Sequence, residues 1–185
     1  MTSQRFAGRV AVVSGAAHGI GKGIVLRLIR EGCRVAAVDI DADGLAELER
    51  QSAAQAAEVL PLACDVTRAD ALQEMLAQVD KAYGRLDFLV NNAGGSPRHA
   101  LDDLSPERWS QILDLNLSSQ FLCVHYALPY LRQSDRAAVV NIASLHAWRT
   151  VKGLLPYASA KGGVVAFTTA LALELGPSVR VNAVA

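Results

Sequence analysis

Short apolar runs recur along the chain, and most are followed by a turn and then by a stretch with apolar residues at helical spacing. The runs are rich in β-branched residues and show little alternation, which is typical of parallel strands covered on both faces. The pattern predicts six such strands, at residues 9–14, 34–40, 59–64, 85–90, 137–144 and 180–185.

The stretches between the first predicted strands favour helices. Apolar residues Ile20, Ile24 and Leu28 lie on one face of a helix after the first strand. Asp41 is placed to cap a further helix through residues 45–50.

The later helices carry their own start and stop signals. Thr67 and Asp70 have the spacing of a capping box. Ser105 and Pro106 look like a cap and first residue of a long helix, and residues 176–177, Gly-Pro, end the last helix.

Repeated strand–helix units predict right-handed crossovers and a parallel sheet with helices on both faces. We therefore expect an α/β fold, a Rossmann-type doubly wound sheet with six strands, forming a single domain over residues 1–185. The formal net charge is zero and no strongly charged block occurs, which argues against nucleic acid or an anionic membrane as the main partner.

No run resembles a membrane span and the N-terminus lacks the apolar core of a signal peptide, so we expect a cytoplasmic protein. Cys33, Cys64 and Cys123 are far apart, which fits buried thiols in a reducing compartment. The four histidines lack metal-ligand spacing, so we expect no metal.

Polar residues stand where the predicted strands end. A single one is explained by the start of a turn, but their repetition favours a ligand site, because ligands of open α/β sheets bind outside the carboxyl ends of the strands. These residues are Ser14, Asp39, Asp65, Asn91, Asn92 and Ser144.

A glycine-rich turn follows the first strand and opens a helix. Gly15, Gly19 and Gly21 would let the backbone approach a pyrophosphate, and the helix N-terminus supplies free N–H groups. The spacing G-x-x-x-G-x-G differs from the common dinucleotide fingerprint, so a simple tight turn stays open as an alternative.

Asp39 stands where a carboxylate can bond both hydroxyls of an adenosine ribose. A 2′-phosphate would meet it as a like charge, no Arg or Lys follows it directly, and the glycine turn offers His18 rather than a permanent cation. This favours NAD over NADP as the cofactor. The alternative is that Asp39 only caps a helix.

Tyr157 and Lys161 are four residues apart and would share one helix face. An ammonium near a phenol favours the phenolate, by roughly 3 kcal/mol at ~5 Å and an effective dielectric of about 20. The pattern therefore indicates an activated tyrosine. The alternative is an ordinary helix with a surface lysine and a packed tyrosine.

Asn116 falls on the apolar stripe of the helix that contains Trp109. An amide there needs partners, because leaving it unpaired costs ~1–3 kcal/mol. It either bonds a neighbouring backbone carbonyl and steadies the fold, or interrupts the helix and holds a water.

The pieces SGAAHGIG, VDI, CDV, NNAG, LNL, NIAS, YASAK and RVNAVA together resemble the short-chain dehydrogenase/reductase family, in its short single-domain branch. One departure is Ser14, where the family usually has threonine; its hydroxyl can make the same bonds. The resemblance implies hydride transfer between NAD(H) and a secondary alcohol or ketone, with Tyr157 as general acid and base.

The resemblance also implies roles for individual residues. The catalytic tetrad would be Asn116, Ser144, Tyr157 and Lys161. The cofactor would be bound by Ser14, Gly15, Ala17, His18, Gly19, Ile20, Gly21, Asp39, Ile40, Asp65, Val66, Asn92, Ala93, Gly94, Tyr157 and Lys161. The substrate would contact Ser144, His146, Leu154 and Tyr157.

By the same resemblance, a last edge strand and a substrate lid would follow residue 185, so we expect a C-terminally truncated chain of reduced activity. The helices carrying Asn116 and Tyr157 would pair subunits into a homodimer or homotetramer. Open alternatives are an inactive nucleotide-binding remnant, an NADP-dependent ketoreductase and a sugar-nucleotide epimerase or dehydratase. Cyclic alcohols, steroids, sugars and acyl chains fit equally well as substrates.

Overall fold

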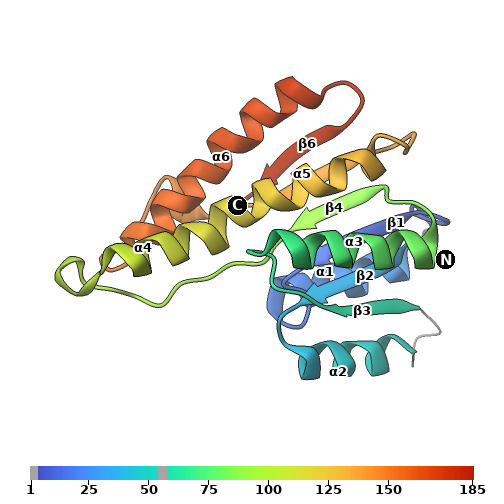
Figure 1. Ribbon diagram of the computed structural model, residues 1–185, viewed down its shortest axis with the longest axis horizontal. Helices are drawn as coiled ribbons and strands as arrows, with labels where there is room; N and C mark the ends of the chain where they lie inside the picture. The colour runs from blue at the N-terminus through green and yellow to red at the C-terminus, as the bar shows by residue number, and fades with distance from the viewer. Residues whose placement is uncertain (1–3, 54–57) are drawn as a thin grey trace.

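A computed structural model describes residues 4–53 and 58–185 of the chain (Figure 1). Its six strands form one parallel sheet in the order β3-β2-β1-β4-β5-β6, which confirms the predicted fold class. The strands are β1 (Val10–Ser14), β2 (Arg34–Asp39), β3 (Val59–Ala63), β4 (Phe88–Asn91), β5 (Ala138–Ile142) and β6 (Arg180–Val184).

Helices connect the strands. The α-helices are α1 (Gly19–Arg30), α2 (Ala42–Ala53), α3 (Ala69–Tyr83), α4 (Pro106–Leu113), α5 (Ser119–Leu131) and α6 (Leu155–Leu175). Two short 3-10 turns, η1 (Leu101–Asp103) and η3 (Leu145–Ala147), lie in loops, and a π-helical turn, η2 (Asp114–Ser118), joins α4 to α5. In the described part of the chain, no helix has the length and apolar character to span a membrane.

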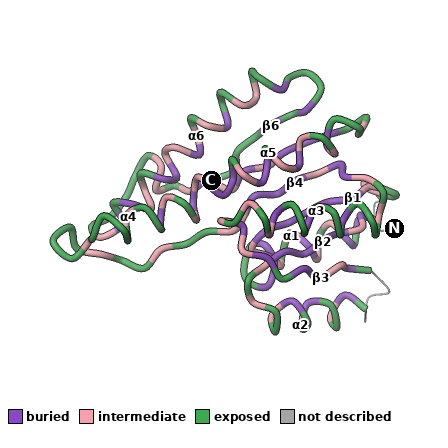
Figure 2. The backbone as a smooth tube through the Cα atoms, viewed as in Figure 1, coloured by how far each residue is buried: buried purple, intermediate pink, exposed green. Residues whose placement is uncertain are grey.

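The sheet separates two hydrophobic cores. Val10 and Val12 of β1 point into the core beneath α3, α5 and α6, whereas Ala11 and Val13 point into the core beneath α1 and α2. Figure 2 shows the resulting burial along β1 and its neighbouring strands, with exposed positions on the outer helix faces. Both faces of each central strand are buried, which is why these strands are continuous apolar runs in the sequence.

The strand order reverses at β1, which pairs with β2 on one side and β4 on the other. The loops that leave β1 and β4 therefore diverge to opposite faces of the sheet. A crevice opens at such a switch point, outside the carboxyl ends of the strands. This places the polar strand-end residues around one space.

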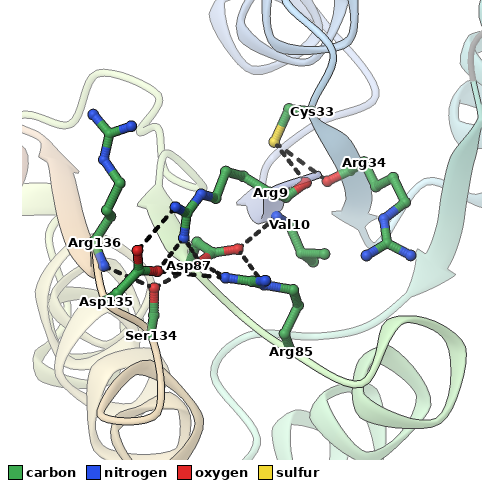
Figure 3. Close-up of polar contacts among 9 residues, drawn as sticks. All are labelled: Arg9, Val10, Cys33, Arg34, Arg85, Asp87, Ser134, Asp135 and Arg136. Carbon is green, nitrogen blue, oxygen red and sulfur yellow. Dashed lines mark hydrogen bonds and ion pairs between the residues drawn. The ribbon is translucent and has the colours of Figure 1, made fainter. Parts of the chain in front are cut away.

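The start of β4 differs most from the prediction, because the strand begins at Phe88 rather than at residue 85. The buried carboxylate of Asp87 instead accepts hydrogen bonds from Val10 N (2.9 Å), Arg85 Nη2 (2.6 Å) and Ser134 Oγ (2.6 Å) (Figure 3). Arg9 bonds the same carboxylate at 3.1 Å. These contacts tie the beginnings of β1 and β4 to the turn before β5. The other strand ends shift by no more than two residues.

Two predicted caps are confirmed. Ser105 Oγ accepts the Arg108 N–H at 3.2 Å at the start of α4, and Asp41 Oδ1 accepts the Gly44 N–H at 3.1 Å at the start of α2. The last helix ends at Leu175, before Gly176, as predicted.

The predicted capping box at α3 is wrong. The N-cap is Arg68, and its side chain makes no capping bond. Thr67 Oγ1 donates instead to Asp65 Oδ1 at 2.7 Å, and Asp70 pairs with Arg68. The carboxylate of Asp65 thus takes the hydroxyl that the capping box would have used.

Candidate active site

A cavity of about 1000 Å³ lies at the carboxyl ends of the strands, where the crevice was expected. Loops after β1, β2, β3, β4 and β5 contribute to its wall, together with α4 and α6. Of the residues predicted from the sequence, it is lined by Gly15, His18, Gly19, Ile20, Asp39, Ile40, Asp65, Val66, Asn92, Ala93, Gly94, Ser144, Tyr157 and Lys161.

The other predicted residues do not line the cavity, and several of them support it from behind. Ser14 Oγ accepts the N–H groups of Asn92 (3.0 Å) and Ala93 (3.1 Å), which fixes the loop after β4 against the end of β1. Ala17 N donates to Asp39 Oδ2 at 2.9 Å. Leu154 is buried just before α6 and does not line the cavity.

The glycine turn is shaped by close backbone approach. A Cβ at Gly15 would lie 2.9 Å from Ala93 Cα, and one at Gly21 would lie 1.9 Å from the Gly15 carbonyl oxygen. Gly21 does not line the cavity. Its missing side chain instead allows α1 to pack closely onto the turn. Gly19 begins α1 and lines the cavity, with no atom within 4 Å of its Cβ position. The helix N-terminus is thus open to a ligand.

Asp39 is held in place by the backbone. Its Oδ2 accepts Ala17 N, and its Oδ1 accepts Asp41 N at 3.1 Å. Asp41 also bonds the imidazole of His18, with 2.6 Å between Oδ2 and Nε2. An oriented carboxylate and an imidazole already engaged by a second carboxylate therefore border the same end of the cavity.

Ser144, Tyr157 and Lys161 come together on the cavity wall. Lys161 Nζ donates to the Ile142 carbonyl at 2.7 Å and lies 5.6 Å from the centroid of the Tyr157 ring. Burial lowers the pKa of Lys161 to about 8. Because that value is above 7, its ammonium remains largely charged at neutral pH.

His146 supports this group rather than lining the cavity. Its backbone N–H donates to Ser144 Oγ at 3.2 Å. Its ring stands edge-to-face to that of Tyr157, with 6.0 Å between the centroids. His146 thus contacts two of the predicted catalytic side chains.

Asn116 lies fully buried in the π-helical turn η2. Its Nδ2 donates to the carbonyls of Ile112 and Gly95, both at 2.9 Å, and its Oδ1 accepts Gly95 N at 2.8 Å. Both the bond to a neighbouring carbonyl and the interruption of the helix are therefore present.

Gly94 separates Asn116 from Lys161. A Cβ at Gly94 would lie 2.7 Å from Asn116 Oδ1 and 3.5 Å from Lys161 Nζ. The two polar groups therefore flank the same small space, which only a residue without a side chain leaves open.

Sequence reasoning missed several cavity residues. The cavity wall also includes Arg108, Gln111 and Leu115, which lie at i, i+3 and i+7 on one helix face. Because these positions come shortly before Asn116 in the sequence, their helical spacing could have identified them. Ile142 and Ala143 follow from the strand-end rule once β5 is placed. The remaining unpredicted positions on the wall are Cys64, Thr67, Val184 and Ala185.

A glycine turn at the switch point of a doubly wound sheet is the nucleotide-binding arrangement of Rossmann-type domains. The model of the short chain dehydrogenase family matches residues 9–185 of this chain. The chain therefore belongs to the short-chain dehydrogenase/reductase family of oxidoreductases, which includes dehydrogenases acting on alcohols.

Individual relatives agree. The chain is 39% identical to the (2S)-[(R)-hydroxy(phenyl)methyl]succinyl-CoA dehydrogenase subunit BbsD of Thauera aromatica, covering 96% of this chain and 71% of that protein. It is 35% identical to the 3-oxoacyl-[acyl-carrier-protein] reductase FabG of Thermotoga maritima, covering 98% and 74%. The crystal structure of carveol dehydrogenase from Mycobacterium avium in complex with NAD matches with a TM-score of 0.91 at 30% identity, covering 97% and 70%.

Proposed function

We propose that this chain is an NAD-dependent dehydrogenase that transfers a hydride between NAD(H) and a secondary alcohol or ketone, with Tyr157 as general acid and base. The observation that carries the proposal is the convergence of Ser144, Tyr157 and Lys161 on the cavity that also contains the glycine turn. A proton-transfer group and a dinucleotide site in one cavity are what this reaction requires.

The residues present fit a nicotinamide dinucleotide. Gly15 and Gly19 would hold the pyrophosphate, because both line the cavity at the open end of α1. Asp39 would hold the adenosine ribose, and by family resemblance Asp65 and Val66 would flank the adenine. When bound, the nicotinamide supplies the acceptor or, in its reduced form, the donor of the hydride.

The surroundings of Asp39 support NAD over NADP. A 2′-phosphate would face its carboxylate as a like charge. His18 could offer a positive charge in the same region, but its ring is already bonded to Asp41. The ratio of the rates measured with NAD and with NADP distinguishes the proposed function from the alternative of an NADP-dependent ketoreductase.

The side chains have complementary proton roles. Because Ser144 Oγ accepts the His146 N–H, the hydroxyl proton of Ser144 is free to be donated to a substrate oxygen. Tyr157 as phenolate takes the proton of an alcohol, and as phenol it returns a proton to a ketone oxygen. Lys161 holds its ammonium 5.6 Å from the centroid of the Tyr157 ring, so a positive charge stands beside the group proposed to transfer the proton.

The proposed substrate is a secondary alcohol or ketone. The two relatives named above are, by name, a (2S)-[(R)-hydroxy(phenyl)methyl]succinyl-CoA dehydrogenase subunit and a 3-oxoacyl-[acyl-carrier-protein] reductase. Assembly into a homodimer or homotetramer through α5 and α6 is supported by apolar side chains that these helices expose, among them Phe121 and Leu173. Sedimentation at several protein concentrations tests this.

The test of the function is a screen of secondary alcohols with NAD, followed by absorbance of the reduced cofactor. On a substrate so found, we expect Tyr157→Phe to lower kcat by at least ~100-fold while NADH binding, measured by fluorescence, persists. Tyr130→Phe, on α5, is the control and should keep the native rate. An unchanged rate for Tyr157→Phe would remove this residue from its role.

A further inference from the structure

Three buried polar side chains form a hydrogen-bonded ladder behind the cavity. Asn91 Nδ2 donates to Asn141 Oδ1 at 2.9 Å, Asn141 Nδ2 donates to Thr168 Oγ1 at 3.0 Å, and Thr168 Oγ1 donates to the Val164 carbonyl at 2.7 Å. Asn91, Asn141 and Thr168 are 1%, 0% and 6% exposed. The ladder therefore joins β4, β5 and α6 inside the protein.

Two members of the ladder directly precede cavity residues, and the third lies on the helix that carries Lys161. Asn91 and Asn141 are opposite one another in the β4–β5 pairing, and Asn91 directly precedes the cavity residues 92–94. Asn141 directly precedes Ile142, whose carbonyl accepts Lys161 Nζ. Thr168 is seven residues after Lys161, two helical turns along the same face of α6. Helix α6 is thus hydrogen-bonded to two successive residues of β5.

The hydrophobic pattern of α6 does not by itself select which face of the helix is buried. The helix carries apolar residues on all sides rather than on one stripe, as in its run VVAFTTALAL. Because burial of apolar surface is non-directional, hydrophobicity alone distinguishes the faces of such a helix only weakly. Hydrogen bonds require a defined distance and angle, and an unmade one in the interior is costly. The bonds from Lys161 and Asn141 therefore select one setting of the helix.

We propose that Thr168, through its bond with Asn141, is a positioning residue that fixes the rotation and axial position of α6 against β5. This fixed setting keeps Lys161 on the Ile142 carbonyl and Tyr157 on the same cavity wall as Ser144. The inference rests on the proposed function for its effect on turnover, but its effect on Lys161 is independent of any cofactor.

The first experiment compares variants in the oxidation of a secondary alcohol by NAD. Thr168→Val removes the hydroxyl at nearly constant volume and should lower kcat by about tenfold, with KM changed by less than about threefold. Thr168→Ser retains the hydroxyl and should restore kcat to within about threefold of the native value. Thr169→Val is the matched control, because this exposed neighbour bonds only the Val165 carbonyl in the described part of the chain (3.0 Å).

The second experiment uses the cofactor-free protein. The Lys161 side chain is titrated by ¹³C NMR, with its signal assigned by its loss in Lys161→Arg. In Thr168→Val we expect the pKa of Lys161 to rise from about 8 toward the ordinary lysine value, because a loosened α6 admits water to the ammonium. Thr168→Ser and Thr169→Val should leave the titration unchanged.

The outcomes separate the two proposals. A native kcat and an unshifted Lys161 titration in Thr168→Val would overturn the positioning role, as would equal losses in Thr168→Val and Thr168→Ser. A shifted titration, in a protein that turns over no alcohol even in native form, would support the positioning role and refute the proposed function. Should Thr168→Val fail to fold, Thr168→Ala removes the same hydroxyl and gives the same readouts.

Discussion

Lys161 donates a hydrogen bond of 2.7 Å to the backbone carbonyl of Ile142 while its side chain is almost fully buried. The bond brings a charged group from α6 to the last residue of β5, two residues before Ser144. Few lysines are buried to this extent, because removing an ammonium from water is costly. Its burial gives the site a measurable signature.

That signature is a dependence of stability on pH. Burial lowers the pKa of Lys161 to about 8 from an ordinary 10.5, so the folded chain releases this proton before the unfolded chain does. The cost of burying the charge is complete below pH 8 and disappears as the pH rises toward 10.5. The contribution of Lys161 to stability therefore increases with pH in this window.

We expect the difference in free energy of unfolding between Lys161→Met and the native chain to fall by roughly 2 kcal/mol between pH 7 and pH 10. Urea denaturation at a series of pH values measures it. The lost bond to Ile142 adds a constant and does not affect the slope. Lys152→Met, at an exposed site, should show no such slope. A constant difference for Lys161→Met would contradict the prediction.

Asp39→Ala should narrow the preference for NAD over NADP by about tenfold or more, because it removes both the ribose acceptor and the repulsion of a 2′-phosphate. The ratio of kcat/KM values for the two cofactors measures this. Asp43→Ala, an exposed acid in the first turn of α2, is the control. Equal use of both cofactors by the native chain would show that the interpretation of Asp39 is wrong.

Gly94→Ala should lower kcat by about tenfold or more, because the new methyl group would lie 2.7 Å from Asn116 Oδ1 and enter the space beside Lys161. Asn116 cannot move aside easily, since it is bonded to the backbone of Gly95 on both its amide atoms. Gly23→Ala is the control, because among the described residues no atom beyond its chain neighbours and its own helix backbone lies within 4 Å of its Cβ position. Equal rates for the two variants would refute this account of Gly94.

Asp87 should make the fold sensitive to acid. Burial would raise the pKa of Asp87, but hydrogen bonds from Arg85, Ser134 and Val10 outweigh it and hold the value at about 2. The stabilisation is complete above the ordinary pKa of 3.8 and is lost as the pH falls toward 2. Asp87→Asn should therefore lower the free energy of unfolding at pH 7 by about 2 kcal/mol or more, and by much less at pH 2.

Urea denaturation of Asp87→Asn at pH 7 and near pH 2 checks the acid effect. Asp103→Asn, at an exposed position in η1, serves as the reference and should behave as the native chain at both values. An equal effect of Asp87→Asn at the two pH values would show that the charge of Asp87 is not what stabilises the beginnings of β1 and β4.

The sheet could be predicted because its central strands are apolar runs buried on both faces, and the strand-end rule then gathered Ser14, Asp39 and Ser144 at one edge. What could not be predicted depends on contacts distant in sequence. Asp87 meets Val10 and Ser134, and no local pattern announces those partners.

Competition between nearby hydrogen-bond partners also could not be predicted from the sequence. The hydroxyl of Thr67 could either cap α3 or bond the carboxylate of Asp65, and in the structure it bonds Asp65. The sequence likewise predicts that Asn116 needs hydrogen-bond partners, but it does not identify them. They are the backbone N–H and carbonyl of Gly95, in a loop whose path depends on the whole fold.

The π-helical turn around Asn116 winds one additional residue into the connection between α4 and α5. Beyond it, every side chain is turned by about 100° from where an unbroken α-helix would aim it. The part of the helix before the turn can thus present Arg108 and Gln111 to the cavity, while the part after it packs Cys123 and Val124 inside the protein. Deleting one residue from this turn would rotate the part after it relative to the part before it. The helix could then no longer line the cavity with one part and pack into the core with the other.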